Sequence, residues 1–162
     1  HAANSVEMLR VLGRACGAEG MAGGQALDLA AVGHKLSLAE LERMHAYKTG
    51  ALIRACIRLG ALTANAEQAT LDALDRYGHA VGLAFQVRDD ILDVEGESAV
   101  IGKTAGKDAA ADKPTFPSII GLDASRARLA DLTGEALDAI APLGARGELL
   151  QELARYAAGR HH

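Results

Sequence analysis

Apolar residues recur every three or four positions along most of the chain, which is the spacing of amphipathic helices rather than of strands. The clearest pattern starts at Ser37, where Glu40 three residues later completes a capping box, a typical helix start. The helix that it predicts runs to about Gly60. Its apolar stripe consists of Leu41, Met44, Leu52, Ala55 and Leu59.

Further helices follow from the same spacing in the rest of the chain. Asn4 is a candidate N-cap for the first one, and Thr115 with Pro117 predicts the start of a short one. Longer helices are predicted over 21–29, 68–94, 124–140 and 147–158. No strand-like alternation or internal repeat interrupts the pattern. We therefore expect residues 1–162 to form an all-α domain, or a large piece of one, with about six or seven helices.

A strip of polar residues breaks the apolar pattern of the predicted helix 68–94. Gln86, Asp89, Asp90 and Asp93 fall within about a third of the helix circumference, and most of their neighbours are apolar. Three carboxylates within two turns repel one another, so they need either water or a cation. One interpretation is a solvated acidic face. The other is a Mg²⁺ site, in which Asp oxygens one turn apart share the cation and a phosphate completes its shell.

Basic residues occur where an anion could bind. Lys48 falls on the apolar stripe of the helix 38–60, with Thr49 beside it, and an inward lysine either extends to the surface or needs an anion. The glycine-rich stretch 96–114 is predicted to be irregular. It is either a flexible surface loop or a mobile lid that carries cations over an anionic site. Its lysines are Lys103, Lys107 and Lys113.

Carboxylates and lysines together are the composition of a site for a polyphosphate bridged by Mg²⁺. The sequence contains no P-loop, no protein-kinase signature and no adjacent His-Asp pair. The expected ligand is therefore a diphosphate that is not the tail of a nucleotide.

Composition narrows the class of protein further. A formal net charge of −4 provides no electrostatic footprint for nucleic acid. No apolar run is long enough to span a bilayer, and no secretory signal is evident. Cys16 and Cys56 lack a CxxC partner, which indicates two buried free thiols in a reducing compartment and no cysteine-based zinc site. We expect a cytoplasmic protein.

Five motifs occur in order along the chain and carry a resemblance to a known family. They are GMAGGQALDL at 20–29, HAYKTGALIRACIRLGAL at 45–62, GLAFQVRDDILD at 82–93, GKTAGKD at 102–108 and DKPTFP at 112–117. Together they resemble the C-terminal half of a trans-isoprenyl diphosphate synthase, most of all the bacterial farnesyl diphosphate synthases. The resemblance covers nearly the whole chain. DDxxD alone is common by chance, whereas FQxxDDxxD between KTGAL and GKxxGxD is specific.

The resemblance implies an isoprenoid synthase bundle that transfers prenyl groups. An allylic diphosphate ionises with the help of Mg²⁺, and isopentenyl diphosphate attacks the resulting carbocation head to tail, giving a short-chain product such as geranyl or farnesyl diphosphate. The resemblance also implies a homodimer. It assigns Asp89, Asp90, Asp93 and Asp28 to the metal set. Asp28 and Gln25 match a pair of polar residues on the helix that faces Lys48. Lys48, Lys103 and Lys113 would hold the allylic diphosphate, and Thr49 and Gln86 would lie near the carbocation.

One departure from the family pattern qualifies this expectation. Such enzymes carry a first aspartate-rich motif in their N-terminal half, whereas DDxxD occurs once here, at 89–93. We therefore expect the N-terminal helices of the bundle to be missing and the 162-residue fragment alone to be inactive. Two other interpretations stay open, namely a half-length, non-catalytic partner of a synthase and a class I terpene cyclase. Product length, the preferred allylic substrate and the oligomeric state of the fragment do not follow from the sequence.

Overall fold

The computed structural model describes residues 2–99 and 113–160, and within these ranges the chain is helical, without a strand. The described helices are α1 (Ala2–Cys16), α2 (Met21–Ala31), α3 (Leu38–His45), the π-helical turn η1 (Ala46–Gly50), α4 (Ala51–Thr63), α5 (Gln68–Ala99), α7 (Phe116–Ile120), α8 (Leu122–Ile140), the 3-10 turn η2 (Ala141–Gly147) and α9 (Glu148–Gly159). The predicted all-α fold is confirmed.

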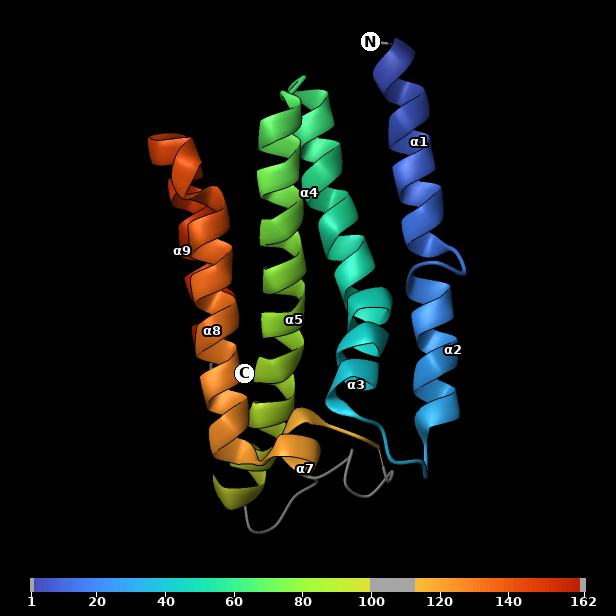
Figure 1. Ribbon diagram of the computed structural model, residues 1–162, viewed down its shortest axis with the longest axis vertical. Helices are drawn as coiled ribbons and strands as arrows, with labels where there is room; N and C mark the ends of the chain where they lie inside the picture. The colour runs from blue at the N-terminus through green and yellow to red at the C-terminus, as the bar shows by residue number, and fades with distance from the viewer. Residues whose placement is uncertain (1, 100–112, 161–162) are drawn as a thin grey trace.

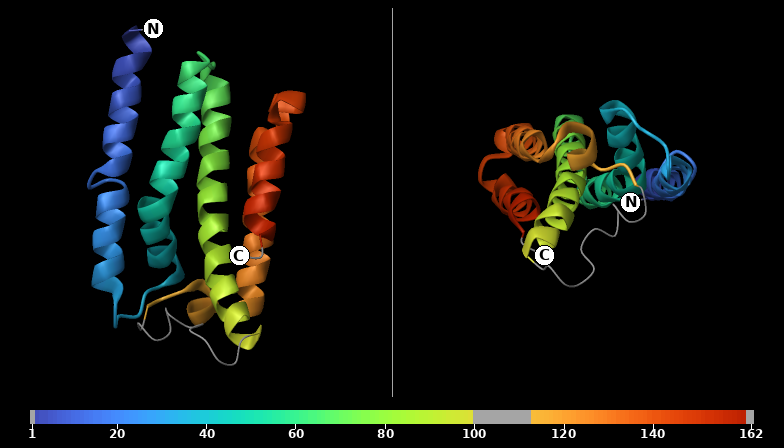
Figure 2. Two further views of the ribbon diagram at one scale, coloured as in Figure 1. Left: turned by 180° about the vertical axis from the view of Figure 1, so that it is seen from behind. Right: turned by 90° about the horizontal axis from the view of Figure 1, so that it is seen from below.

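The long helices run nearly side by side in an elongated bundle (Figures 1 and 2). Helix α5 lies in the middle and packs against α4 on one side and against α8 and α9 on the other. Helices α1 and α2 form an outer layer, α1 against α4 and α2 against η1. The helix α5 therefore presents different faces to several neighbours, and what its residues do depends on which neighbour they meet.

Apolar side chains from α3, α5, α7 and α8 form one part of the core. Burying such side chains is the main stabilising contribution to a bundle of this size. Those with no more than 2% of their surface exposed in this part of the core are Leu41, Met44, Leu83, Ala84, Val87, Ile91, Phe116 and Leu132. The aspartate-bearing end of α5 is thus anchored in the core on the side away from its polar strip.

The predicted helix 38–60 is confirmed, but it is not a uniform α-helix. Ser37 and Glu40 form the predicted capping box at its start. The turn η1 then inserts a π-helical segment, which changes the angular register of the residues that follow. Sequence periodicity alone did not predict this turn.

Two glycines allow neighbouring helices to approach η1 closely. A Cβ atom on Gly24 of α2 would lie 2.1 Å from the backbone nitrogen of Lys48, and one on Gly82 of α5 would lie 3.0 Å from the Cα of Gly50. No larger residue fits at Gly24 without moving α2 or η1. Glycine lowers helix propensity, and at Gly24 that cost is offset by the close helix crossing that it permits.

Several local predictions need correction. Asn4 lies inside α1 instead of capping it, and its amide donates to Leu62 O at 3.0 Å and to Asn65 Oδ1 at 2.9 Å, which fastens α1 to the end of α4. Helix α5 continues to Ala99, so the start of the predicted irregular stretch is helical. Cys16 and Cys56 are free, as predicted, but both are exposed rather than buried.

Helix α7 begins where the sequence predicts, directly after Thr115. Thr115 and Ser118 cap one another reciprocally, and Pro117 lies in the first turn. None of the described helices combines the length and the apolarity needed to cross a membrane.

Candidate active site

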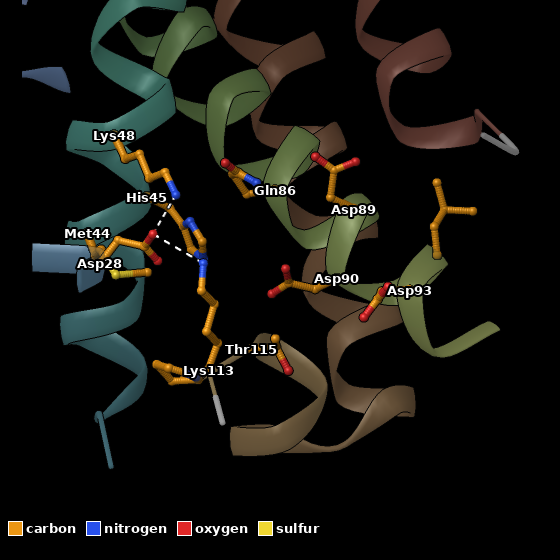
Figure 3. A pocket seen from close by; sticks show the side chains of 12 residues that line it. Asp28, Met44, His45, Lys48, Gln86, Asp89, Asp90, Asp93, Lys113 and Thr115 are labelled. Carbon is orange, nitrogen blue, oxygen red and sulfur yellow. Dashed lines mark hydrogen bonds and ion pairs between the residues drawn. The ribbon is translucent and has the colours of Figure 1, made fainter. Parts of the chain in front are cut away.

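A pocket of about 510 Å³ opens between α5 and the helices α2 and α3, and it gathers most of the residues that the sequence singled out (Figure 3). One wall comes from α2, α3 and η1, the opposite wall from α5, and the floor from the segment that leads into α7. The polar residues that line it are Asp28, His45, Lys48, Gln86, Asp89, Asp90, Asp93, Lys113 and Thr115.

The first wall, together with Lys113 of the adjoining floor, is cationic. Lys48 Nζ lies 2.7 Å from Asp28 Oδ2, and Lys113 Nζ lies 3.5 Å from the same oxygen. Burial disfavours the ionised form of Asp28, but the hydrogen bond and charge of Lys48, together with Lys113, outweigh it and hold the Asp28 pKa below its usual value. Two ammonium groups thus share one carboxylate, which leaves a net positive charge at this wall.

Asp28 therefore has cationic partners. Its predicted role as a metal ligand stays a prediction, and its geometry favours a different role, in which it positions Lys48 and Lys113. Gln25, its predicted partner on α2, is exposed and does not line the pocket.

Thr49 and Gln86 are in contact, and their assigned place near the carbocation stays a prediction. The Thr49 hydroxyl donates to Gln86 Oε1 and links η1 to α5. The contact fixes the amide side chain of Gln86 at the inner end of the acidic strip.

The three aspartates of the DDxxD motif in α5 have three different environments. Asp90 is 6% exposed, and its Oδ2 accepts a hydrogen bond of 2.8 Å from the backbone N–H of Phe116. Its carboxylate thereby anchors the start of α7. Its predicted metal role is untested, whereas this structural role is directly visible.

Asp89 forms an ion pair with Arg160, the residue that follows α9. The guanidinium of Arg160 lies 3.9 Å over the ring of Phe85 and donates to Phe85 O at 3.1 Å, while Arg160 O accepts from Arg88 Nε at 2.8 Å. The sequence predicted no chemistry for this part of the chain. No spacing signal connects residue 160 with residue 89, because only the fold brings them together.

Asp93 lies one turn beyond Asp89, at the outer edge of the pocket (Figure 3). It makes no hydrogen bond or ion pair with any residue in the described ranges, so its carboxylate is available to a ligand. Lys103, predicted to bind diphosphate, lies outside the described residues.

The donor set fits a hard divalent cation that arrives with a phosphorylated ligand. Within residues 2–99 and 113–160, no cluster of three or more His, Cys, Asp or Glu side chains could hold a metal ion by itself. Mg²⁺ is commonly held by only one or two carboxylates, with substrate phosphates and water completing its shell. Asp93 and Asp89 can supply such carboxylates.

His45 is a pocket residue that the sequence analysis did not select. It is 8% exposed and stacks on Phe116, with ring centroids 5.7 Å apart and an interplanar angle of 16°. Burial, and then the charge of Lys48, lower its pKa to about 4, so the imidazole is neutral at physiological pH. A signal was available, because residue 45 falls on the inward side of the helix one turn before Lys48.

An all-α bundle in which a strip of aspartates faces lysines across a pocket is the architecture of a class of enzymes that act on isoprenyl diphosphates. The chain belongs to the Polyprenyl synthetase family, whose model matches residues 1–141. This match confirms the predicted family, and the similarity to solved structures confirms the predicted isoprenoid synthase fold.

Individual relatives agree with the family. The chain is 51% identical over 158 residues to the "Probable farnesyl diphosphate synthase" of Sinorhizobium fredii, covering 95% of this chain and 48% of the relative. It is 44% identical over 160 residues to the farnesyl diphosphate synthase of Escherichia coli, covering 96% and 54%. The Helicobacter pylori geranyltransferase complexed with magnesium and isoprenyl diphosphate has a TM-score of 0.78 and 31% identity, covering 97% and 52%. The chain thus spans about half the length of the curated relatives it matches.

Proposed function

We propose that this chain is part of a prenyltransferase that makes a short-chain isoprenyl diphosphate from an allylic diphosphate and isopentenyl diphosphate. The observation that carries the proposal is the opposition of two walls across one pocket, with Lys48 and Lys113 on one side and Asp89 and Asp93 on the other. A diphosphate with Mg²⁺ has both negative oxygens for the lysines and a cation for the carboxylates.

Each residue then has a role in the transfer. Lys48 and Lys113 hold the diphosphate of the allylic substrate, with Lys103 as a further candidate. The allylic C–O bond breaks, and the electron pair leaves with the diphosphate. Gln86 and Thr49 supply oxygen dipoles beside the carbocation. The double bond of isopentenyl diphosphate forms the new C–C bond, and a proton is lost to the departing diphosphate.

Mg²⁺ is the proposed cofactor, held by Asp89 and Asp93. When bound, it neutralises charge on the leaving diphosphate and so favours ionisation. The Helicobacter pylori relative was crystallised with magnesium and isoprenyl diphosphate, which supports this choice. Asp28 and Asp90 act by positioning the lysines and α7.

A homodimer in the cytoplasm is the proposed setting. Several large apolar side chains of α1 and α2 are exposed, and a second copy could cover them. The absence of a membrane-spanning helix from the described residues is compatible with this proposal.

Because DDxxD occurs once in these 162 residues, we expect the chain by itself to bind a diphosphate with Mg²⁺ without catalysing transfer.

Calorimetric titration of the chain with inorganic diphosphate in the presence of Mg²⁺ tests the site. Replacing Lys48 or Asp93 by Ala removes a charged contact, and we expect the Kd to rise by about 10- to 100-fold. Lys35→Ala and Asp131→Ala are matched controls, because both residues are exposed and lie outside the pocket. No binding by the unsubstituted chain, or equal effects of site and control variants, would refute the proposed site.

The reaction is tested separately, in the complete protein that contains these residues. Elongation of an allylic diphosphate by isopentenyl diphosphate supports a prenyltransferase. Conversion of an allylic diphosphate alone into a hydrocarbon would instead indicate a terpene cyclase. Diphosphate binding with neither conversion would indicate a non-catalytic partner.

A further inference from the structure

The ring of His45 is the most conspicuous buried polar group outside the roles proposed so far. Neither Nδ1 nor Nε2 has a hydrogen-bond partner in the described part of the structure, and neither atom is accessible to solvent. Buried polar atoms are nearly always paired, because leaving them unpaired costs free energy. An orphaned donor and an orphaned acceptor on one ring therefore need an explanation.

Packing alone does not explain a histidine at this position. The ring stacks on Phe116 in an aromatic contact that a phenylalanine would make equally well, without two unpaired nitrogen atoms. The chain therefore has a residue here that weakens the unliganded fold. Such a departure from optimal packing is characteristic of a functional position.

The location of the ring indicates what would pair with it. His45 lines the pocket on the same wall as Asp28 and Lys48, opposite the aspartates of α5 (Figure 3). A ligand drawn to this wall by Lys48 and Lys113 is an anion rich in oxygen acceptors.

We propose that His45 is a substrate-contacting residue, whose ring N–H donates a hydrogen bond to a phosphate oxygen of the diphosphate held by Lys48 and Lys113. This proposal rests on the proposed function, because it requires a diphosphate in the pocket. It adds a neutral donor to a binding site otherwise made of charged groups.

The electrostatics of the wall favour a neutral donor here. The imidazole, with its pKa of about 4, carries one N–H and one acceptor nitrogen at physiological pH. The N–H donates to the phosphate oxygen, and the acceptor nitrogen can accept a hydrogen bond from the ammonium group of Lys48 on the same wall. Because both nitrogens are covered in the unliganded structure, side chains around the ring must shift as the diphosphate binds.

The experiment exploits opposite effects on stability and on binding. His45→Phe keeps a ring that stacks on Phe116 and removes both orphaned nitrogens. We expect the thermal midpoint of the free chain to stay the same or rise, while the Kd for inorganic diphosphate with Mg²⁺ rises about tenfold, as for the loss of one hydrogen bond to a charged group. His45→Gln restores an N–H donor and should recover part of the affinity. His79→Phe, at an exposed histidine of α5, is the matched control.

A spectroscopic measurement on the unsubstituted chain gives an independent answer, even if a variant fails to fold. Saturation with inorganic diphosphate and Mg²⁺ should shift the imidazole ¹⁵N and N–H proton resonances of His45 and leave those of His79 in place. An unchanged Kd for His45→Phe, or an unshifted His45 resonance at saturation, overturns this proposal alone when Lys48→Ala still weakens binding. Failure of the unsubstituted chain to bind diphosphate overturns the proposed function and this inference with it.

Discussion

Replacing Asp90 by Ala should destabilise the fold, although Asp90 belongs to the motif that the sequence assigns to metal binding. Its Oδ2 accepts the hydrogen bond of the Phe116 backbone N–H, 26 residues further along the chain. Both residues are buried, Phe116 completely and Asp90 to all but 6%. Truncation at Asp90 therefore leaves an amide donor unpaired in the core, where water cannot replace the lost acceptor.

The size of the effect follows from the kind of contact. A buried hydrogen bond to a charged acceptor contributes about 1.5–3 kcal/mol, and the unpaired N–H keeps its desolvation cost. We expect the free energy of unfolding to fall by about 2–3 kcal/mol. For a chain of this length that corresponds to a drop of roughly 5–10 °C in Tm. Asp90→Asn keeps a carbonyl acceptor and should cost less.

Thermal and urea unfolding of the metal-free chain measure this effect, with Asp93→Ala as the matched control. Asp93 has the same side chain three positions on, but no partner among the described residues, so its replacement should change stability by no more than about 0.5 kcal/mol. Diphosphate binding should respond to Asp93→Ala even though stability does not. Equal stability of the Asp90→Ala and Asp93→Ala chains would refute the distinction between a structural and a ligand-binding aspartate.

Four further predictions follow from the same structure. Gly24→Ala places a Cβ against the backbone of η1 and should cost about 1–3 kcal/mol in urea unfolding, whereas Gly13→Ala, with open space around it, should not destabilise the chain. Arg160→Gln should lower the free energy of unfolding by about 1–2 kcal/mol, because its aromatic contact and hydrogen bonds are lost while the partly exposed ion pair itself contributes little. The pKa of His45 is about 4, so between pH 6.5 and 4 the unfolded chain binds a proton there that the folded chain does not. The free energy of unfolding should therefore decrease as the pH is lowered through this window, by up to roughly 3 kcal/mol. His45→Phe should remove this pH dependence from the unfolding curves. Removal of Mg²⁺ by a chelator should abolish diphosphate binding in calorimetry.

Each of these predictions has a contrary result. Equal stability of the two glycine variants would show that α2 and η1 separate without cost. An unchanged free energy of unfolding for Arg160→Gln would mean that the contacts of Arg160 with Phe85 and Asp89 do not stabilise the fold. A pH slope that persists in His45→Phe would assign it to other groups, and binding of metal-free diphosphate would remove the need for the aspartates.

The helices of the bundle could be predicted because their signals are local. The capping box at Ser37 and the spacing of apolar residues depend on neighbours within one or two turns, and the structure follows them closely. Lys48 could be predicted to point inward for the same reason. Its pairing with Asp28 agrees with the motif assignments, which placed both on facing helices.

Features that arise from contacts between distant segments could not be predicted. The ion pair between Asp89 and Arg160 joins residues 71 positions apart and depends on the path of α9. Which apolar side chains are covered shows the same limit, because it depends on the packing of distant helices. Leu41 and Val81 are buried by other helices. Among the described residues, the exposed large apolar side chains lie on α1, α2 and α9 and at the residue that follows α2, namely Val6, Leu9, Leu12, Met21, Leu27, Leu29, Val32, Leu149, Leu153 and Tyr156.

The DDxxD motif shows why spacing identifies a site without assigning its parts. Helical periodicity places Asp89, Asp90 and Asp93 on one side of α5, but each carboxylate meets a different element of the fold. Arg160 pairs with the first, the start of α7 engages the second, and the third is open to the pocket. A cation that enters the unliganded site thus meets the available carboxylate of Asp93, whereas Asp89 must first be released from its ion pair with Arg160. Since one or two carboxylates hold Mg²⁺ weakly without phosphate oxygens, the metal and the diphosphate should bind together rather than in sequence.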